Sequence, residues 1–200
     1  MKIRTYEVLS LPLFMKPISF SDTSPLPSID EVPMLWDRFG MLDNIRDHSR
    51  VVCGVALTLT GWLEEAGVVL NRRAVELGAL LHDITKTPCL GTPRRHDEEG
   101  RTLLLELGYP ELAYLVGVHV RLPDPHPVDE SFVVYYADKR VMHDEVVDLA
   151  TRFAYIAERY GKQDAALLGL IDRGRLRAEA AERELFTVIG PHRCPQDLGR

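Results

Sequence analysis

Six histidine and aspartate residues of the sequence stand out because imidazole and carboxylate groups bind metal ions. Imidazole nitrogens suit iron, manganese, zinc or nickel, and one carboxylate can bridge two cations and offset their repulsion. The pair His82–Asp83 follows the apolar run "GALL", where a buried carboxylate needs a partner. Taken singly, a histidine near a helix end is usually a capping or surface residue, and Asp138 could pair with Lys139 or Arg140. The set as a whole predicts a metal site: His48, His82, Asp83, His96, His119 and Asp138.

The elements that must position these residues are predicted to be helices, so the expected fold class is all-α. Apolar residues recur at helical spacing from Ile45 to Trp62 and place His48 on the apolar face. The run "FVVYYA" could be a strand on propensity alone, but its length and its helical neighbours favour a helix. In a helical bundle, side chains from facing helices can converge on a metal site. Helices are predicted for residues 43–67 (N-cap Asp43), 71–86 (N-cap Asn71, ended by Pro88), 96–108, 110–120, 130–146, 149–160 and 163–188.

The composition predicts one globular domain with irregular ends. Residues 1–33 carry five prolines and are predicted to form an extended arm, residues 34–189 the domain and residues 190–200 a tail. A net charge of −6 argues against general nucleic-acid binding. No apolar stretch is long enough to span a membrane, and the apolar N-terminal segment is broken by Pro12. The three cysteines form no CxxC pair, so a cytoplasmic protein is expected, with Cys53 and Cys89 as packing residues.

The order of the motifs "DHS", "LLHDITK", "RRHDEEG", "GVHV" and "YYADKR" resembles the HD-domain superfamily of metal-dependent phosphohydrolases. That family is all-helical, and its pattern H…HD…H…H…D provides six ligands for two metal ions. The resemblance covers roughly residues 40–160. Within the family, the sequence is most similar to small stand-alone bacterial proteins, including the YqeK type, which split diadenosine tetraphosphate symmetrically. The GYP signature of cyclic-di-nucleotide phosphodiesterases is absent from the sequence.

The resemblance implies a role for each of the six residues. His48, His82, Asp83 and Asp138 would hold a first divalent ion, and Asp83 would bridge to a second ion held by His96 and His119. Iron or manganese is the first expectation, with zinc, nickel, cobalt or magnesium as alternatives. The sequence departs from the family at Asp97, which adds a carboxylate beside His96, and at Val120, where some subfamilies have a second histidine.

Basic residues near these motifs are candidates for substrate binding. Lys86 matches the lysine of the family's HDxxK run and is predicted, four residues after His82, to share its helix face and to contact a phosphate. Arg94, Arg95 and Arg121, with Arg101, would add positive charge around the site, although a solvated basic loop is an equal alternative. The remaining histidines match no ligand position and are expected to be exposed: His126, His143 and His192.

The function implied by the resemblance is hydrolysis of a phosphoester or phosphoanhydride by water activated between two metal ions. Asp83 and Lys86 are the expected catalytic residues, and the substrate is expected to be a nucleotide or a dinucleoside polyphosphate. Two alternatives remain open: a di-iron oxygenase on the same fold, and a metal-binding regulatory domain without catalysis. A homodimer is also compatible with the sequence, and no membrane or general nucleic-acid partner is expected.

Overall fold

The computed structural model describes residues 19–21, 23–161 and 164–199. Most of the predicted arm, residues 1–18 and 22, lies outside this part of the chain. Residues 29–33 of that arm are helical: a 3-10 helix, η1 (Ile29–Glu31), leads into α1 (Val32–Arg38), and Pro33 occupies a first-turn position that tolerates proline. The predicted domain boundaries stay a prediction.

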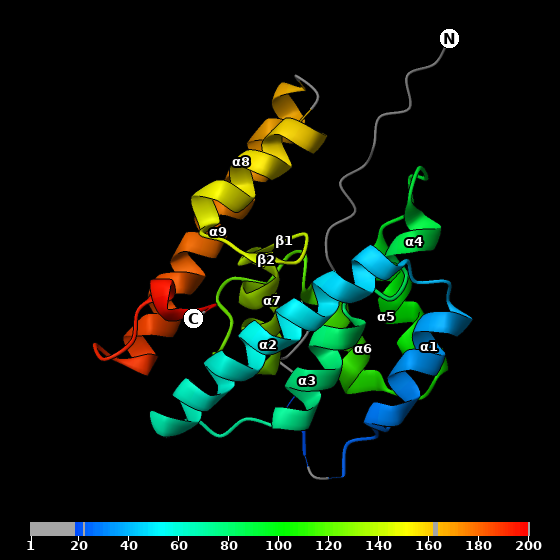
Figure 1. Cartoon of the computed structure of the whole chain (residues 1–200), viewed down its shortest axis with the longest axis horizontal. Coiled ribbons are helices and arrows are strands. Elements are labelled where there is room, and N and C mark those ends of the chain that lie inside the picture. The colour runs from blue at the N-terminus through cyan, green and yellow to red at the C-terminus, as the bar shows by residue number, and fades with distance from the viewer. Residues whose placement is uncertain (1–18, 22, 162–163, 200) are drawn as a thin grey trace.

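The central element of the fold is α7 (Glu130–Lys139), in which every residue is buried. The helices α2 (Asp43–Glu65) and α3 (Arg72–Leu81) pack against α7 and against each other. On the other side, α6 (Pro110–Val118) packs on α7, on α3 and on α5 (His96–Glu106). Figure 1 shows this bundle, running in colour from cyan α2 to yellow-green α7. The all-α prediction is confirmed, because the described residues contain only a two-stranded hairpin besides helices.

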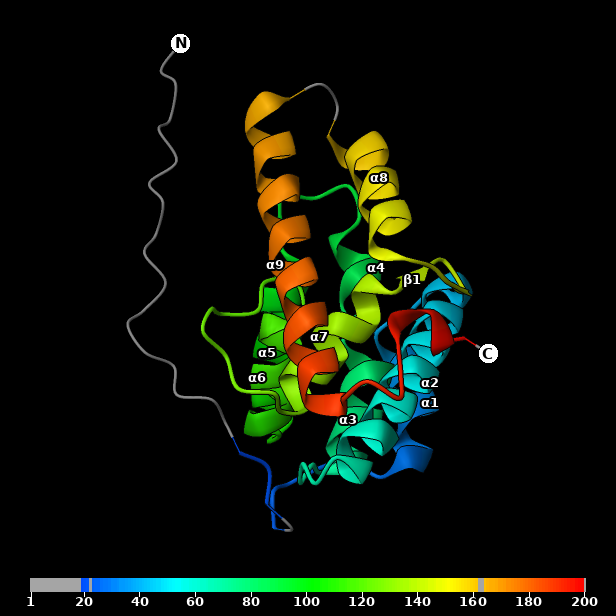
Figure 2. The ribbon, with the colours of Figure 1, turned by 90° about the vertical axis from the view of Figure 1, so that its left-hand side faces the viewer.

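The last two long helices form a hairpin that leans on the bundle. α8 (Leu149–Tyr160) and α9 (Ala165–Ile189) lie side by side in both views, and their connected ends extend beyond the bundle (Figures 1 and 2). The other half of α9 packs on α7 and α2. A short 3-10 helix, η2 (Pro195–Asp197), follows in the predicted tail. None of the helices in the described residues is long and apolar enough to cross a membrane.

Most predicted helix boundaries agree with the structure because capping residues mark them. The Asn71 side chain accepts a hydrogen bond from the Ala74 N–H at 3.0 Å, as expected for an N-cap. Asp43 is instead the first residue of α2, and Leu42 occupies the N-cap position. The carboxylate of Asp43 therefore acts as an acidic group in the first turn, where it interacts favourably with the helix dipole.

The predicted helix over residues 71–86, with Pro88 as its stop, is wrong after Leu81. α3 ends at Leu81, residues 82–85 form turns, and a separate short helix, α4 (Lys86–Cys89), contains Pro88 rather than ending before it. The change has a local cause: Nδ1 of His82 lies 2.7 Å from the carbonyl oxygen of Ala79, three residues earlier. The ring then occupies a carbonyl oxygen that would accept a backbone N–H if the helix continued. The chain instead continues in turns whose hydrogen bonds join residues three apart. The Ile84 N–H accordingly bonds the Leu81 carbonyl at 3.1 Å.

The predicted helix over residues 130–146 also ends early. After α7, the strands β1 (Val141–Met142) and β2 (Glu145–Val146) pair antiparallel across a two-residue turn. His143 in that turn has φ +57°, a left-handed conformation that a helix cannot contain. Strands of two residues carry no periodic signal, so the sequence pattern could not separate them from the helix before them.

Candidate metal centre

The pair His82–Asp83 lies where α3 ends, at the centre of the bundle. Both side chains are almost completely buried, with exposed fractions of 0% and 1%. Because Nδ1 of His82 faces the Ala79 carbonyl, which can only accept, Nδ1 carries the hydrogen and Nε2 points away from the helix end. His119 repeats this arrangement at the end of α6, with Nδ1 2.6 Å from the Val116 carbonyl. Each helix end therefore presents one imidazole Nε2 to the interior.

A first cluster forms around Asp138, which comes from the last turn of α7. Nε2 of His48, from α2, lies 3.1 Å from Oδ1 of Asp138. Nε2 of His82 lies 3.7 Å from the same oxygen and 3.4 Å from Oδ2 of Asp83. The His48 ring donates from Nδ1 to the carbonyl of His143 at 2.7 Å, so the β1–β2 turn orients it. Ligand atoms of His48, His82 and Asp83 lie within 4.8 Å of one another, and this cluster could hold a metal ion.

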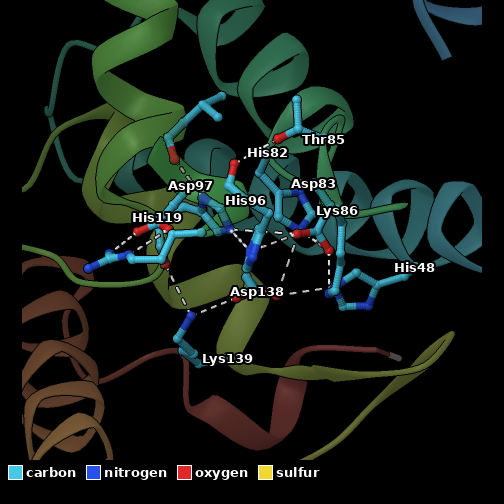
Figure 3. Close-up of polar contacts among 12 residues, drawn as sticks. His48, His82, Asp83, Thr85, Lys86, His96, Asp97, His119, Asp138 and Lys139 are labelled. Atoms are coloured by element: carbon cyan, nitrogen blue, oxygen red, sulfur yellow. Dashed lines mark hydrogen bonds and ion pairs between the residues drawn. The ribbon is translucent and has the colours of Figure 1, made fainter. Parts of the chain in front are cut away.

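A second cluster forms on the other oxygen of Asp83. Oδ1 lies 3.2 Å from Nε2 of His96, at the start of α5, and 3.7 Å from Nε2 of His119. The two imidazole Nε2 atoms are 3.3 Å apart. Asp83, His96 and His119 could hold a second metal ion. Figure 3 shows that Asp83 lies between the two clusters, so its carboxylate has the position of a bridge.

The unpaired atoms at this centre fit a bound cation. Nε2 of His82 and Oδ1 of Asp83 are buried and have no hydrogen-bond partner within the described part of the chain. Since the rings of His48, His82 and His119 carry hydrogen on Nδ1 when neutral, their Nε2 lone pairs face carboxylate oxygens. Two acceptors facing each other repel unless a proton or a metal ion lies between them. Imidazole and carboxylate donors in this mixture suit transition metals.

The carboxylates at the centre are held in the ionised form. Burial alone would raise the pKa of the Asp83 carboxyl, but Lys86 and His82 hold that pKa well below its usual range. In the same way, Lys139 outweighs the effect of burial and keeps the pKa of Asp138 well below its usual range. Both groups are therefore negative at neutral pH and available to a cation.

The two buried histidines at the helix ends differ in their affinity for protons. Burial, with repulsion from His82 and His96, lowers the pKa of His119 to about 4. Burial also lowers the pKa of His82, but the neighbouring Asp83 carboxylate more than compensates and raises it above its ordinary value. His119 is therefore a neutral ligand over the physiological range, whereas a metal ion at His82 competes with a proton.

The predicted substrate-binding residues occupy different surroundings. Lys86 lies on α4 rather than on a continued helix face, and its Nζ donates to Oδ2 of Asp83 at 2.6 Å. Arg95 binds the buried carboxylate of Asp97 through Nε, at 3.1 Å, and through Nη2. This pairing explains how the additional carboxylate of Asp97 is neutralised beside His96.

The two other predicted arginines lie on the surface. Arg94 is exposed and donates to the Pro88 carbonyl at 2.8 Å, and its Nη1 lies 3.6 Å from Glu99. Arg121 is exposed two residues after His119. Neither is held in a fixed place within the clusters.

The prediction from the sequence was wrong for one histidine and did not include one cation, Arg152. His126 is buried, not exposed as predicted: its Nε2 lies 3.2 Å from the Tyr114 hydroxyl, within the fold and away from the clusters. His143 and His192 are exposed as predicted, and Cys53 and Cys89 are buried. The buried Lys139 donates to Asp138 at 2.6 Å and to the His119 carbonyl at 3.1 Å, so it is the partner of Asp138 among the two that the sequence left open. Arg152, near Asp138, follows no motif in the sequence.

Comparison with known proteins agrees with this geometry. A family model described as an HD domain matches residues 47–150, just over half of the chain. The matched segment contains all six histidine and aspartate residues of the two clusters. No curated protein and no solved structure matches the chain significantly.

Proposed function

The chain belongs to the HD-domain family, and we propose that it is a metal-dependent phosphohydrolase that cleaves a phosphoester or phosphoanhydride bond. One observation carries the proposal: Asp83 is shared by two clusters, with Oδ2 directed to the first and Oδ1 to the second. A buried carboxylate in this position, surrounded by imidazoles, suits two cations held close together.

The residues that would hold the ions are those predicted from the resemblance. His48, His82, Asp83 and Asp138 would hold the first ion, and Asp83, His96 and His119 the second. Iron or manganese is proposed, with zinc, nickel, cobalt or magnesium as alternatives. Two such ions, when bound, would supply Lewis acidity to a phosphoryl oxygen and would lower the pKa of a nearby water towards neutrality.

The protein's own charges would then position the phosphate. The Lys86 ammonium lies 2.6 Å from Oδ2 of Asp83, so it is placed to meet a phosphoryl oxygen at the first cluster. The Lys139 ammonium holds Asp138 from the opposite oxygen and keeps the carboxylate in place. Arg94, Arg95 and Arg121 would attract an anionic substrate to the rim of the site.

The proposed substrate is a nucleotide or a dinucleoside polyphosphate, with symmetrical cleavage of dinucleoside tetraphosphates as the first reaction to test. This choice rests on the resemblance of the sequence to the YqeK type. The proposed setting is the cytoplasm, and the proposed assembly is a homodimer.

The test is a screen of nucleotides and dinucleoside polyphosphates, with phosphate release and metal content measured in manganese- and ferrous-loaded protein. We expect Asp83→Ala to lose metal and activity together, because it removes a ligand from both clusters. The control is Asp43→Ala, since that carboxylate is 97% exposed and outside the site. An active, metal-free Asp83→Ala protein would contradict the proposal. Oxygen uptake by ferrous protein without phosphate release would favour the oxygenase, and less than one metal ion per wild-type chain would favour the regulatory domain.

A further inference from the structure

Arg152 is a nearly buried cation beside the first cluster. It lies in the first turn of α8, and its side chain is 12% exposed. Its Nη2 lies 3.9 Å from Oδ1 of Asp138, which is too long for a hydrogen bond. The guanidinium of Arg152 donates no hydrogen bond to any described residue, and its Nε is buried without a partner. The guanidinium, whose nearest carboxylate is that of Asp138 at 3.9 Å, is therefore not tied by hydrogen bonds to the described part of the fold next to a cluster that could hold a metal ion.

Two arginines of similar burial differ in their terminal nitrogens. The Nε of Arg177, whose side chain is also 12% exposed, lacks a partner as in Arg152, but its Nη1 and Nη2 donate to Glu184 and to the Pro123 carbonyl. Arg140, at 5% exposed, donates to two backbone carbonyls and to the Tyr136 hydroxyl. Burying a charged group without hydrogen bonds is costly. We therefore expect the Arg152 guanidinium to bind a group that is not part of the protein itself.

The position of Arg152 is fixed relative to the first cluster. One turn further along α8, the ring of Tyr155 contacts the ring of His143, with centroids 5.1 Å apart. The carbonyl of that same His143 accepts the hydrogen bond that orients His48. Figure 1 shows the beginning of α8 next to the β1–β2 hairpin. The hairpin thus ties α8, and with it Arg152, to a residue of the first cluster.

Arg152 also lies within electrostatic reach of Lys86. Burial lowers the pKa of Lys86, the carboxylates of Asp83 and Asp138 raise it overall, and the positive charge of Arg152 opposes that rise. The cations Lys86 and Arg152 therefore lie beside the carboxylates of Asp83 and Asp138. If these carboxylates bind metal ions, both cations remain available to bind an anion.

We propose that Arg152 binds a phosphate group of the substrate at the first cluster, together with Lys86. The planar guanidinium can donate two parallel hydrogen bonds to two phosphate oxygens, whereas the Lys86 ammonium acts as a point charge. Arg152 is then a substrate-binding residue that orients the phosphate. The role as a substrate contact rests on the proposed phosphohydrolase function, but phosphate binding itself is measurable without turnover.

The test compares binding of inorganic phosphate by calorimetry to the manganese-loaded full chain and its variants. In Arg152→Gln, we expect the Kd for phosphate to rise about 10-fold or more, because charge-assisted hydrogen bonds are lost. Arg152→Lys keeps the positive charge but loses the planar guanidinium. Its Kd for phosphate should therefore lie between those of the wild type and Arg152→Gln. Arg159→Gln removes an equal charge from an exposed position of the same helix and should leave the Kd unchanged. Metal content and circular dichroism are measured on every sample.

The outcomes separate this inference from the proposed function. An unchanged Kd in both Arg152 variants, no phosphate binding by the wild type, or weakening that follows a loss of metal would overturn the inference. If phosphate binding depends on Arg152 but no substrate is hydrolysed, the inference stands and the proposed function fails. If Arg152→Gln hydrolyses substrate with wild-type KM and phosphate affinity, the inference alone fails.

Discussion

Lys139 joins the two clusters through a single buried ammonium group. Its Nζ donates to Oδ2 of Asp138, in the first cluster, and to the backbone carbonyl of His119, in the second. The Lys139→Met variant keeps most of the side-chain volume but removes the charge. We expect metal affinity to fall about 10- to 100-fold, as is typical when a group that orients a ligand is lost. Titration of metal-free protein with manganese against a chelating dye measures the change.

The same substitution leaves the Asp138 carboxylate buried without its main positive partner. Breaking a buried pair in this way costs roughly 3–5 kcal/mol, so the metal-free variant should also unfold at a lower denaturant concentration. Arg183→Met, which removes one positive charge from an exposed position of α9, serves as the control for net charge. Unchanged metal affinity in Lys139→Met would show that Asp138 does not depend on Lys139 for its position.

At the scale of elements, the contact between α3 and α6 sets how the ends of these helices meet. Gly78 of α3 faces the buried Leu115 of α6: a Cβ on Gly78 would lie 2.6 Å from Leu115 Cδ2. One turn after this contact, the rings of His82 and His119 lie with centroids 5.0 Å apart. Close packing at Gly78 therefore fixes the distance between a histidine of each cluster.

We predict opposite effects for alanine at two helical glycines. Gly54, on α2, has nothing within 4 Å of an added Cβ, so Gly54→Ala should stabilise the protein by about 1 kcal/mol through helix propensity alone. Gly78→Ala makes the same gain but overpacks the core, which costs typically about 1–3 kcal/mol. It should therefore lower the free energy of unfolding and weaken metal binding. Urea unfolding and manganese titration of both variants test this. Stabilisation by Gly78→Ala with intact metal binding would show that Leu115 moves aside freely.

The elements that the sequence predicted well are those with a long apolar period and a marked cap, such as 149–160 and the helix that begins after Asn71. The turn after Leu81 was missed because its cause, the bond from His82 to the Ala79 carbonyl, is a local geometry that periodicity does not contain. The six histidine and aspartate positions could be singled out because of their order along the chain. The sequence did not indicate Arg152, because only the packing of α8 on the β1–β2 hairpin brings this residue close to Asp138.

At the scale of the whole molecule, the two clusters join five separate parts of the chain: α2, the turn after α3, α5, the end of α6 and α7. An unfolded chain does not hold these residues together, so metal binding should stabilise the folded state. The size of that stabilisation depends on pH, because protons and metal ions compete for the same imidazoles.

The sign of this dependence follows from two histidines of the metal-free protein. Folding raises the pKa of His82. Protonation of His82 therefore stabilises the fold, and this stabilisation is fully present below the unfolded pKa of about 6.5. It is lost as the pH rises through the higher pKa of the folded state. The pKa of His119 is about 4, so the fold loses stability as pH falls from about 6.5 towards 4. The metal-free protein should therefore be most stable near the unfolded pKa of histidine.

Metal binding must displace the proton of His82, and therefore the stabilisation by metal should grow with pH. We expect the difference in Tm between manganese-loaded and chelator-treated protein to be small at pH 5 and to widen up to pH 8. Calorimetry in buffers of different ionisation enthalpy should show proton release on binding at the lower pH values. His192→Ala, which removes an exposed histidine of the tail, should leave the profile unchanged. A Tm difference that is constant over this range would mean that the ion does not compete with the His82 proton, and would place the metal away from its Nε2.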